Sequence, residues 1–231
     1  MEKKIILVTG SNKGIGYEVV RQLAKLGHEV ILTARTETKG LEAAEKLKNE
    51  NLFAHFLVLD ITQEESILHA ASKVKSEFGK LDVLINNAAV SLPGDYSLLK
   101  NDPAITEQIM NTNGSAQLAV TRAFHPLIPK GGRIIMVSSG GGSMSDPVGG
   151  WSPAYCVSKS FLGAITRHLA YELSARKIAV NAFDPGWVKT DMGGPAAPGS
   201  VEEGADTAVW LASTDKMATG KFFRNKKEIP W

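Results

Sequence analysis

Short apolar runs alternate with amphipathic stretches along almost the whole chain. The apolar runs are rich in Val, Ile and Leu and have the length of buried strands: Ile5–Val8, Val30–Leu32, Phe56–Leu59, Leu81–Ile85, Ile134–Val137 and Ile178–Phe183. The stretches between them have helical spacing: Tyr17–Leu26, Leu41–Lys48, Glu64–Phe78, Ile105–Phe124 and Tyr155–Ala175. This alternation predicts a single α/β domain over residues 1–231, a doubly wound, Rossmann-type parallel sheet with helices on both faces.

In such a sheet, ligands bind at the carboxyl ends of the strands. Two long segments rich in Gly, Pro and Ser, 138–153 and 185–200, each follow a predicted strand and so belong at that edge. Loops of this length in a compact domain are usually functional. We expect substrate loops near 91–97, 140–153 and 187–200.

Composition narrows the class of protein. The 231 residues are 43% hydrophobic and 22% charged, as in an ordinary globular protein. The net charge is only +2, so the charge balance does not indicate a nucleic-acid-binding protein. The single cysteine, Cys156, excludes an intrachain disulfide and favours a reducing, cytoplasmic compartment. No apolar run reaches the 18 residues of a membrane span, and the five histidines show no metal-ligand spacing, so we expect neither membrane nor metal.

A glycine-rich loop follows the first predicted strand. Gly10 permits a tight turn, Gly14 permits close backbone approach to a pyrophosphate, and Gly16 lets the next helix pack on the strand. The exposed N–H groups at the start of that helix suit an anion. We expect a dinucleotide site formed by Gly10, Ser11, Asn12, Lys13, Gly14, Ile15 and Gly16.

The residue after the second strand predicts which dinucleotide binds. An acidic residue there would grip a ribose 2′-hydroxyl and favour NAD, but this chain has Arg35. Arginine suits the 2′-phosphate of NADP, and Lys13 could reach the same group. NADP(H) is therefore the expected cofactor.

Five motifs in this order resemble the short-chain dehydrogenases/reductases, and the resemblance covers nearly the whole chain. They are Thr9–Gly16, Asn86–Ala89, Val137–Ser139, Tyr155–Lys159 and Asp184–Thr190. The glycine loop and the segment ending at Arg35 are most similar to NADPH-dependent carbonyl reductases within that family. Ala89 replaces a customary glycine, and the interval from Ser139 to Tyr155 is a few residues longer than usual.

The resemblance implies roles for individual residues. Asp60 and Ile61 would flank the adenine, and Asn86 would meet the adenosine side of the cofactor. Val188 and Thr190 would hold the nicotinamide carboxamide. Lys159 would bond the nicotinamide ribose and, with Asn113, Ser139 and Tyr155, form the catalytic set.

The active-site asparagine has two candidates. Asn111 has the customary glycine three residues on, at Gly114, whereas Asn113 fits the register of Thr121 and Pro126 downstream. We favour Asn113, which by the resemblance would organise a water linking Lys159 to solvent.

Tyr155 and Lys159 are four residues apart on a predicted helix, so both point from one face. A free phenol has a pKa near 10, roughly three units too high for easy exchange at neutral pH. An ammonium about 4 Å away supplies on the order of 4 kcal/mol at an effective dielectric of about 20, which would suffice to lower that pKa. Tyr155 is thus predicted to be the general acid, and Ser139 to bond the substrate oxygen.

These residues predict NADPH-dependent reduction of an aldehyde, ketone or quinone, with Trp151 and Trp187 as apolar walls of the substrate pocket or, equally, as core residues. One alternative is a non-catalytic NADP-sensing binding protein, which would not need Ser139, Tyr155 or Lys159. Another is an alcohol or sterol dehydrogenase working in the oxidative direction. Relatives often pair through two long helices, so a homodimer or homotetramer is expected.

Overall fold

The computed structural model describes residues 2–215 and 218–231. Its strands are β1 (Ile5–Val8), β2 (Glu29–Ala34), β3 (His55–Val58), β4 (Val83–Asn86), β5 (Arg133–Val137), β6 (Ala179–Asp184), β7 (Phe222–Arg224) and β8 (Lys227–Ile229). Its α-helices are α1 (Gly14–Lys25), α2 (Glu37–Asn49), α3 (Glu64–Phe78), α4 (Pro103–Met110), α5 (Ala116–Phe124), α6 (Pro153–Glu172) and α7 (Val201–Ser213).

The strands form one eight-stranded sheet in the order β3-β2-β1-β4-β5-β6-β7-β8. All neighbours pair in parallel except β7 and β8, which form a short antiparallel pair at the edge. The predicted doubly wound sheet is confirmed, with an antiparallel edge strand as the departure. The strand order reverses between β1 and β4, and such a reversal opens a ligand crevice beyond the carboxyl ends of the strands.

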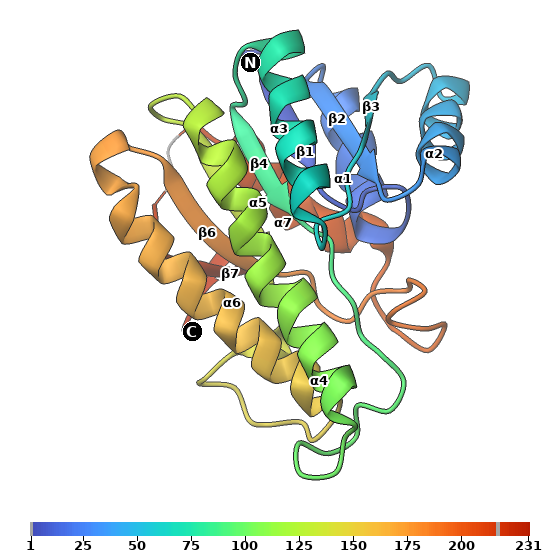
Figure 1. Cartoon of the computed structure of the whole chain (residues 1–231), viewed down its shortest axis with the longest axis vertical. Helices are drawn as coiled ribbons and strands as arrows, with labels where there is room; N and C mark the ends of the chain where they lie inside the picture. Colours follow the sequence, from blue (N-terminus) through green and yellow to red (C-terminus); the bar gives the residue numbers. More distant parts are fainter. Residues whose placement is uncertain (1, 216–217) are drawn as a thin grey trace.

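Helices cover both faces of the sheet and bury a core on each (Figure 1). One core joins the sheet to α3, α5 and α6 through residues such as Ile67, Val120 and Leu162. The other joins it to α1, α2 and α7 through residues such as Val20 and Leu47. Strands buried on both faces explain why their sequences are continuously apolar rather than alternating.

The predicted helix over 105–124 is one long rod in Figure 1, lying alongside α6. Within it, a π-helical segment, η1 (Asn111–Ser115), separates α4 from α5. A π-turn adds a residue to the helix and rotates the turns beyond it, and such turns are frequent at functional sites. Here it carries Asn113.

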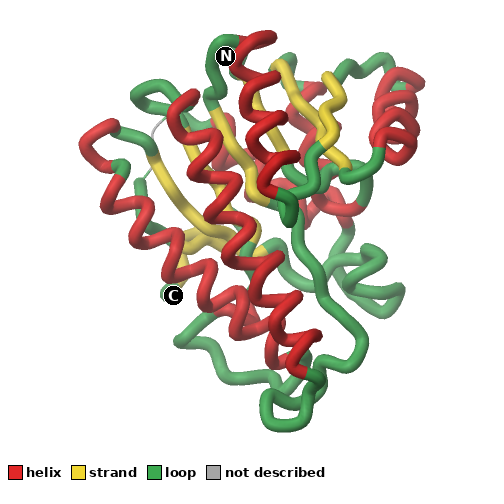
Figure 2. Tube along the Cα trace, viewed as in Figure 1, coloured by secondary structure: helices red, strands yellow, loops and turns green. Residues whose placement is uncertain are grey.

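Long loops leave the carboxyl ends of the strands and gather below the sheet in Figure 2. They include the segments after β4, β5 and β6, which the sequence predicts to be substrate loops. Among the described residues, no helix is both long and apolar enough to cross a membrane.

Candidate active site

The glycine loop between β1 and α1 has the backbone that a phosphate cradle requires. Gly10 and Gly14 adopt left-handed conformations, with φ of 58° and 59°. A Cβ at Gly16 would lie 2.4 Å from Nδ2 of Asn87, so only glycine fits there. Lys13 caps α1 without a side-chain hydrogen bond, which leaves the first N–H groups of the helix available to an anion.

Side chains from neighbouring strands hold this loop in place. Asn87 donates from Nδ2 to the carbonyls of Thr9 and Gly10 at 2.9 and 3.0 Å. The hydroxyl of Thr9 accepts the N–H groups of Asn87 and Ala88. Ser11 is fully buried, its hydroxyl donating to the Val8 carbonyl and accepting from the Thr33 amide, so its side chain shapes the loop.

Arg35 and Asp60 lie at the ends of adjacent strands, β2 and β3. Arg35 is exposed, as a residue that meets a 2′-phosphate must be. Oδ1 of Asp60 accepts from the amide and hydroxyl of Thr62, which turns the chain there. Ile61 packs into the core against α3, so its backbone rather than its side chain lies at the strand edge.

Lys13, which the sequence suggested could reach the 2′-phosphate, has an ionic partner in the structure. Its ammonium pairs with the carboxylate of Asp191, 178 residues downstream, and both side chains are exposed. A role for Lys13 at a 2′-phosphate would require it to leave this partner or to share it.

Asn86 points away from the strand edge. Its Nδ2 donates to the Thr121 hydroxyl at 3.0 Å, and its Oδ1 is buried with no hydrogen-bond partner among the described residues. The adenosine contact predicted for Asn86 would therefore come from its backbone.

The segment after β6 comes back toward the glycine loop. Val188 is buried and pairs with Gly199 in an isolated parallel bridge. The hydroxyl of Thr190 accepts the Gly193 amide, and a Cβ at Gly14 would lie 3.4 Å from Cγ2 of Thr190. Thr190 thus lies beside the cradle, and the nicotinamide role of Val188 and Thr190 stays a prediction.

Ser139, Tyr155 and Lys159 come together at the end of β5. Ser139 lies two residues beyond the strand, near enough to Tyr155 to lower the pKa of its phenol, and its Oγ accepts the Gly141 amide. Nζ of Lys159 lies 5.5 Å from the centre of the Tyr155 ring and donates to the Val137 carbonyl at 2.8 Å. Tyr155 and Lys159 are carried by α6, and Ser139 by the segment that follows β5.

The acidity of this pair differs from the sequence expectation. Burial raises the pKa of Tyr155 to about 12, with Asp184 and Cys156 adding to the rise and Ser139 opposing it. Burial also lowers the pKa of Lys159 to about 8. The predicted lowering of the phenol pKa is wrong because that reasoning counted the attraction between the two charges and omitted the desolvation of each.

Asn113, not Asn111, faces the interior. Its Nδ2 donates to the Val90 carbonyl and the Ser158 hydroxyl, and its Oδ1 accepts the Val90 amide. Asn111 is exposed two residues earlier. Because both N–H groups of the Asn113 amide are used, a water relay through this residue would have to begin at its main-chain carbonyl.

The two tryptophans predicted to wall the substrate pocket lie at the surface and not in the core, with Trp151 50% and Trp187 59% exposed. The Trp151 ring lies 5.9 Å from the Tyr155 ring and is tilted by 36°. Trp187 donates from its ring to the Gly193 carbonyl. Of the two, Trp151 is the one whose flat face borders the candidate catalytic tyrosine.

The chain matches the short-chain dehydrogenase family model over residues 4–200. The chain belongs to this family. It is 35% identical to carbonyl reductase (NADPH) 1 of Sus scrofa over 274 residues, covering 99% of this chain and 94% of the relative. It is also 35% identical to the protein of that name from Homo sapiens, with 98% of each covered. Among solved structures, NADPH-bound carbonyl reductase from chicken fatty liver is 28% identical with a TM-score of 0.89 and full coverage of both chains.

Three carboxylates of this short-chain dehydrogenase make contacts that the sequence reasoning did not predict. Asp184 ends β6, and Arg224 ends β7, where its guanidinium bridges Asp184 at 2.7 Å and Asp146 at 2.8 Å. This bridge fastens the loop after β5 to the sheet. Asp95, in the loop after β4, binds the start of α6. Neither contact follows from spacing, since each joins distant segments.

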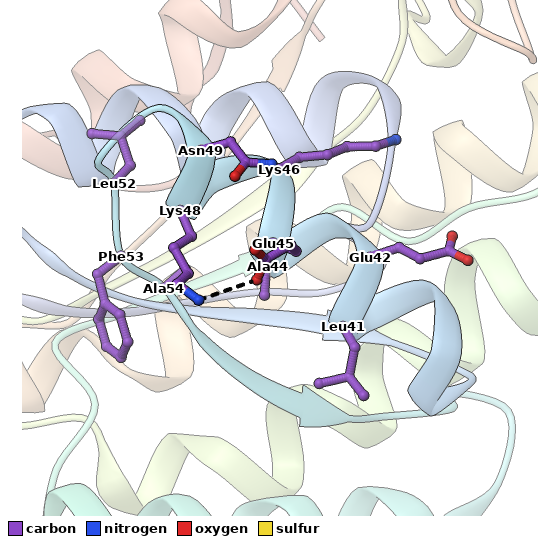
Figure 3. Close-up of a pocket in the computed structure, with 10 residues that line it drawn as sticks. All are labelled: Leu41, Glu42, Ala44, Glu45, Lys46, Lys48, Asn49, Leu52, Phe53 and Ala54. Atoms are coloured by element: carbon purple, nitrogen blue, oxygen red, sulfur yellow. Dashed lines mark ion pairs between the residues drawn. The ribbon is translucent and has the colours of Figure 1, made fainter.

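A surface hollow between α2 and the turn into β3 lies apart from these residues (Figure 3). Leu41, Leu52 and Phe53 supply its apolar lining, and a Lys48–Glu45 ion pair crosses its side. It reaches the amino end of β3, whereas the family's motifs lie at the carboxyl ends of the strands. The hollow is not part of the candidate active site.

Proposed function

We propose that this chain reduces the carbonyl group of an aldehyde, ketone or quinone with NADPH, and that Tyr155 donates the proton. The observation that carries the proposal is the grouping of buried Tyr155 and Lys159 with half-buried Ser139 beyond the carboxyl end of β5. The names of the relatives, which are NADPH carbonyl reductases, support the same reaction class and cofactor.

The residues present fit a phosphorylated dinucleotide. The left-handed glycines and the free start of α1 suit the pyrophosphate, and exposed Arg35 suits a 2′-phosphate. We assign Val188 and Thr190 to the nicotinamide end, which is supported by the position of Thr190 next to Gly14. When bound, the dinucleotide supplies the hydride.

Tyr155 carries its proton at neutral pH, as a general acid must. With a pKa of about 12, its hydroxyl stays protonated at neutral pH. The Ser139 hydroxyl is near enough to oppose the rise in the pKa of Tyr155, and we propose that it donates to the same substrate oxygen, so that two O–H donors stabilise the alkoxide as it forms. Lys159, with a pKa of about 8, remains mostly cationic at pH 7 and stabilises the phenolate left behind.

With this pKa the phenol is protonated at neutral pH, which is the form that reduction of a carbonyl requires; in the oxidative direction the same hydroxyl would first have to lose its proton. The buried hydroxyl of Tyr155 beside Lys159 argues against a pure NADP sensor, because binding of a dinucleotide does not require a proton donor.

Tyr155→Phe tests the proposal. It keeps the ring that packs against Trp151 and removes only the hydroxyl, so we expect turnover to fall about a hundredfold or more, as loss of a general acid does. The dissociation constant for NADPH should change less than threefold. Turnover is measured as NADPH oxidation over a panel of aldehydes, ketones and quinones, and binding by fluorescence titration.

Tyr171→Phe is the matched control, since Tyr171 lies on the same helix and is 82% exposed. It should behave as wild type in both measurements. Wild-type turnover in Tyr155→Phe on every carbonyl tested would reject the mechanism.

A further inference from the structure

The first turn of α6 lacks a cap of its own. The residue before it, Ser152, is in a left-handed conformation with φ of 37° and makes no side-chain capping bond. Pro153 has no N–H, and the Cys156 amide bonds to the Ser152 carbonyl. The amides of Ala154 and Tyr155 are left without a partner in the helix, and both residues are buried from water.

A carboxylate from another loop supplies both missing partners. Oδ1 of Asp95 accepts the Ala154 amide and Oδ2 accepts the Tyr155 amide, each at 2.9 Å. Asp95 is only 2% exposed and lies about 60 residues earlier in the chain, between β4 and α4. Its negative charge also faces the positive end of the α6 dipole, which adds to the attraction.

The loop that carries Asp95 is folded around this carboxylate. Nδ2 of Asn101 donates to Oδ1 of Asp95 at 2.7 Å. Oδ1 of Asn101 in turn accepts the amides of Tyr96 and Ser97 at 3.0 and 2.7 Å. The segment predicted to wall the substrate pocket is thus fixed to the helix that carries Tyr155.

We propose that Asp95 is a positioning residue, which holds the Tyr155 backbone so that its hydroxyl meets Ser139 and ties the substrate loop to the catalytic turn. This inference rests on the proposed function of Tyr155. The charges that raise the pKa of Tyr155 come from Asp184 and Cys156, so Asp95 acts through backbone geometry.

The experiment compares Asp95→Ala with Asp95→Asn and a matched control, Asp102→Ala. Asp102 lies in the same loop and caps α4 by accepting the Ala104 amide at 2.9 Å. Three quantities are measured for each: kcat with a carbonyl substrate, the dissociation constant for NADPH, and amide hydrogen exchange of residues 150–160. The exchange measurement requires no catalysis.

In Asp95→Ala we expect kcat to fall at least tenfold, NADPH binding to stay within twofold, and exchange at the start of α6 to speed at least tenfold. Asp95→Asn keeps one acceptor oxygen, so it should restore at least a third of the lost kcat. If the alanine variant does not fold, the same three quantities measured in Asp95→Asn test the proposal. Asp102→Ala should match wild type in all three measurements.

Unchanged exchange at the start of α6 in Asp95→Ala would overturn the proposal, and so would unchanged kcat or an equal loss of kcat and NADPH affinity. Equal losses in the Asn and Ala variants would also overturn it. If wild-type protein oxidises no NADPH with any carbonyl, the proposed function fails, and the exchange measurement still decides whether Asp95 holds the Tyr155 turn.

Discussion

Tyr155 and Lys159 lie one helical turn apart, and both are almost completely buried. In water their charges would attract each other by about 1 kcal/mol at 4 Å. Inside the protein the loss of hydration acts on each charge separately, which raises the pKa of the tyrosine and lowers that of the lysine. The protein therefore holds a neutral phenol beside an ammonium whose loss of hydration lowers the stability of the fold.

Lys159→Met should show this cost as a pH-dependent stability. The folded protein binds the Lys159 proton with a pKa of about 8, below the ordinary 10.5 that the unfolded chain has. Burial of the charged ammonium destabilises the folded protein fully below pH 8, and this destabilisation decreases as the pH rises toward 10.5. Between pH 7 and 9.5 the unfolding free energy of wild type should therefore rise by about 2 kcal/mol relative to that of Lys159→Met. Urea unfolding at both pH values measures it.

Lys39→Met, at an exposed position on α2, should show no such difference from wild type. If the stabilities of wild type and Lys159→Met change in parallel between the two pH values, the lysine is not desolvated as the structure indicates.

At the scale of elements, periodicity predicted the six longer strands and five helical stretches to within a few residues. It missed the π-turn at Asn111–Ser115, because a turn of five residues leaves no mark in an apolar pattern. It also missed α7, although Ser200 and Glu203 form a capping box that could have signalled its start. Strands β7 and β8 have three residues each, too few for any period.

The sequence predicted candidate residues for the chemistry, but not how they are held. Lys13 pairs with Asp191 and Asp95 binds the Tyr155 amide, and both contacts join segments far apart in the chain. Asn86, Ser11 and Ile61 turn inward although they lie in the predicted dinucleotide motifs. Motifs fix the type of residue at a position, whereas packing decides the direction of its side chain.

Gly16→Ala tests the glycine loop as an element. The new Cβ would meet Nδ2 of Asn87, which holds the Thr9 and Gly10 carbonyls, so the cradle must shift. We expect the dissociation constant for NADPH to rise at least tenfold. Isothermal titration calorimetry measures it, and wild-type affinity in this variant would show that the loop does not bind the cofactor.

Gly79→Ala is the control, because Gly79 ends α3 with φ of 73° and open space around its Cβ position. It should lower the unfolding free energy by about 1 kcal/mol and leave NADPH affinity unchanged.

At the scale of the whole molecule, parallel strands bring all these pieces to one edge. The glycine loop, Arg35, Asp60, Asn87, Ser139 and Asp184 lie at the ends of six different strands. The sheet and the two cores that cover it fix their relative positions, so loops can vary above a constant arrangement of cofactor and proton donor. We therefore predict that the loops after β4, β5 and β6 determine substrate choice; Trp151 and Trp187 are exposed in the last two of them.

The most direct test of the account tracks the hydride and the proton donor together. NADPH is prepared with deuterium at C4 of the nicotinamide, on each face in turn, and the alcohol formed from an aromatic aldehyde or ketone is analysed by mass spectrometry. We predict one deuterium on the former carbonyl carbon with one of the two isomers, and labelled product that forms about a hundredfold more slowly, or slower still, in Tyr155→Phe with NADPH still bound. An alcohol without deuterium from both isomers, or labelled product from Tyr155→Phe at the wild-type rate, would contradict it.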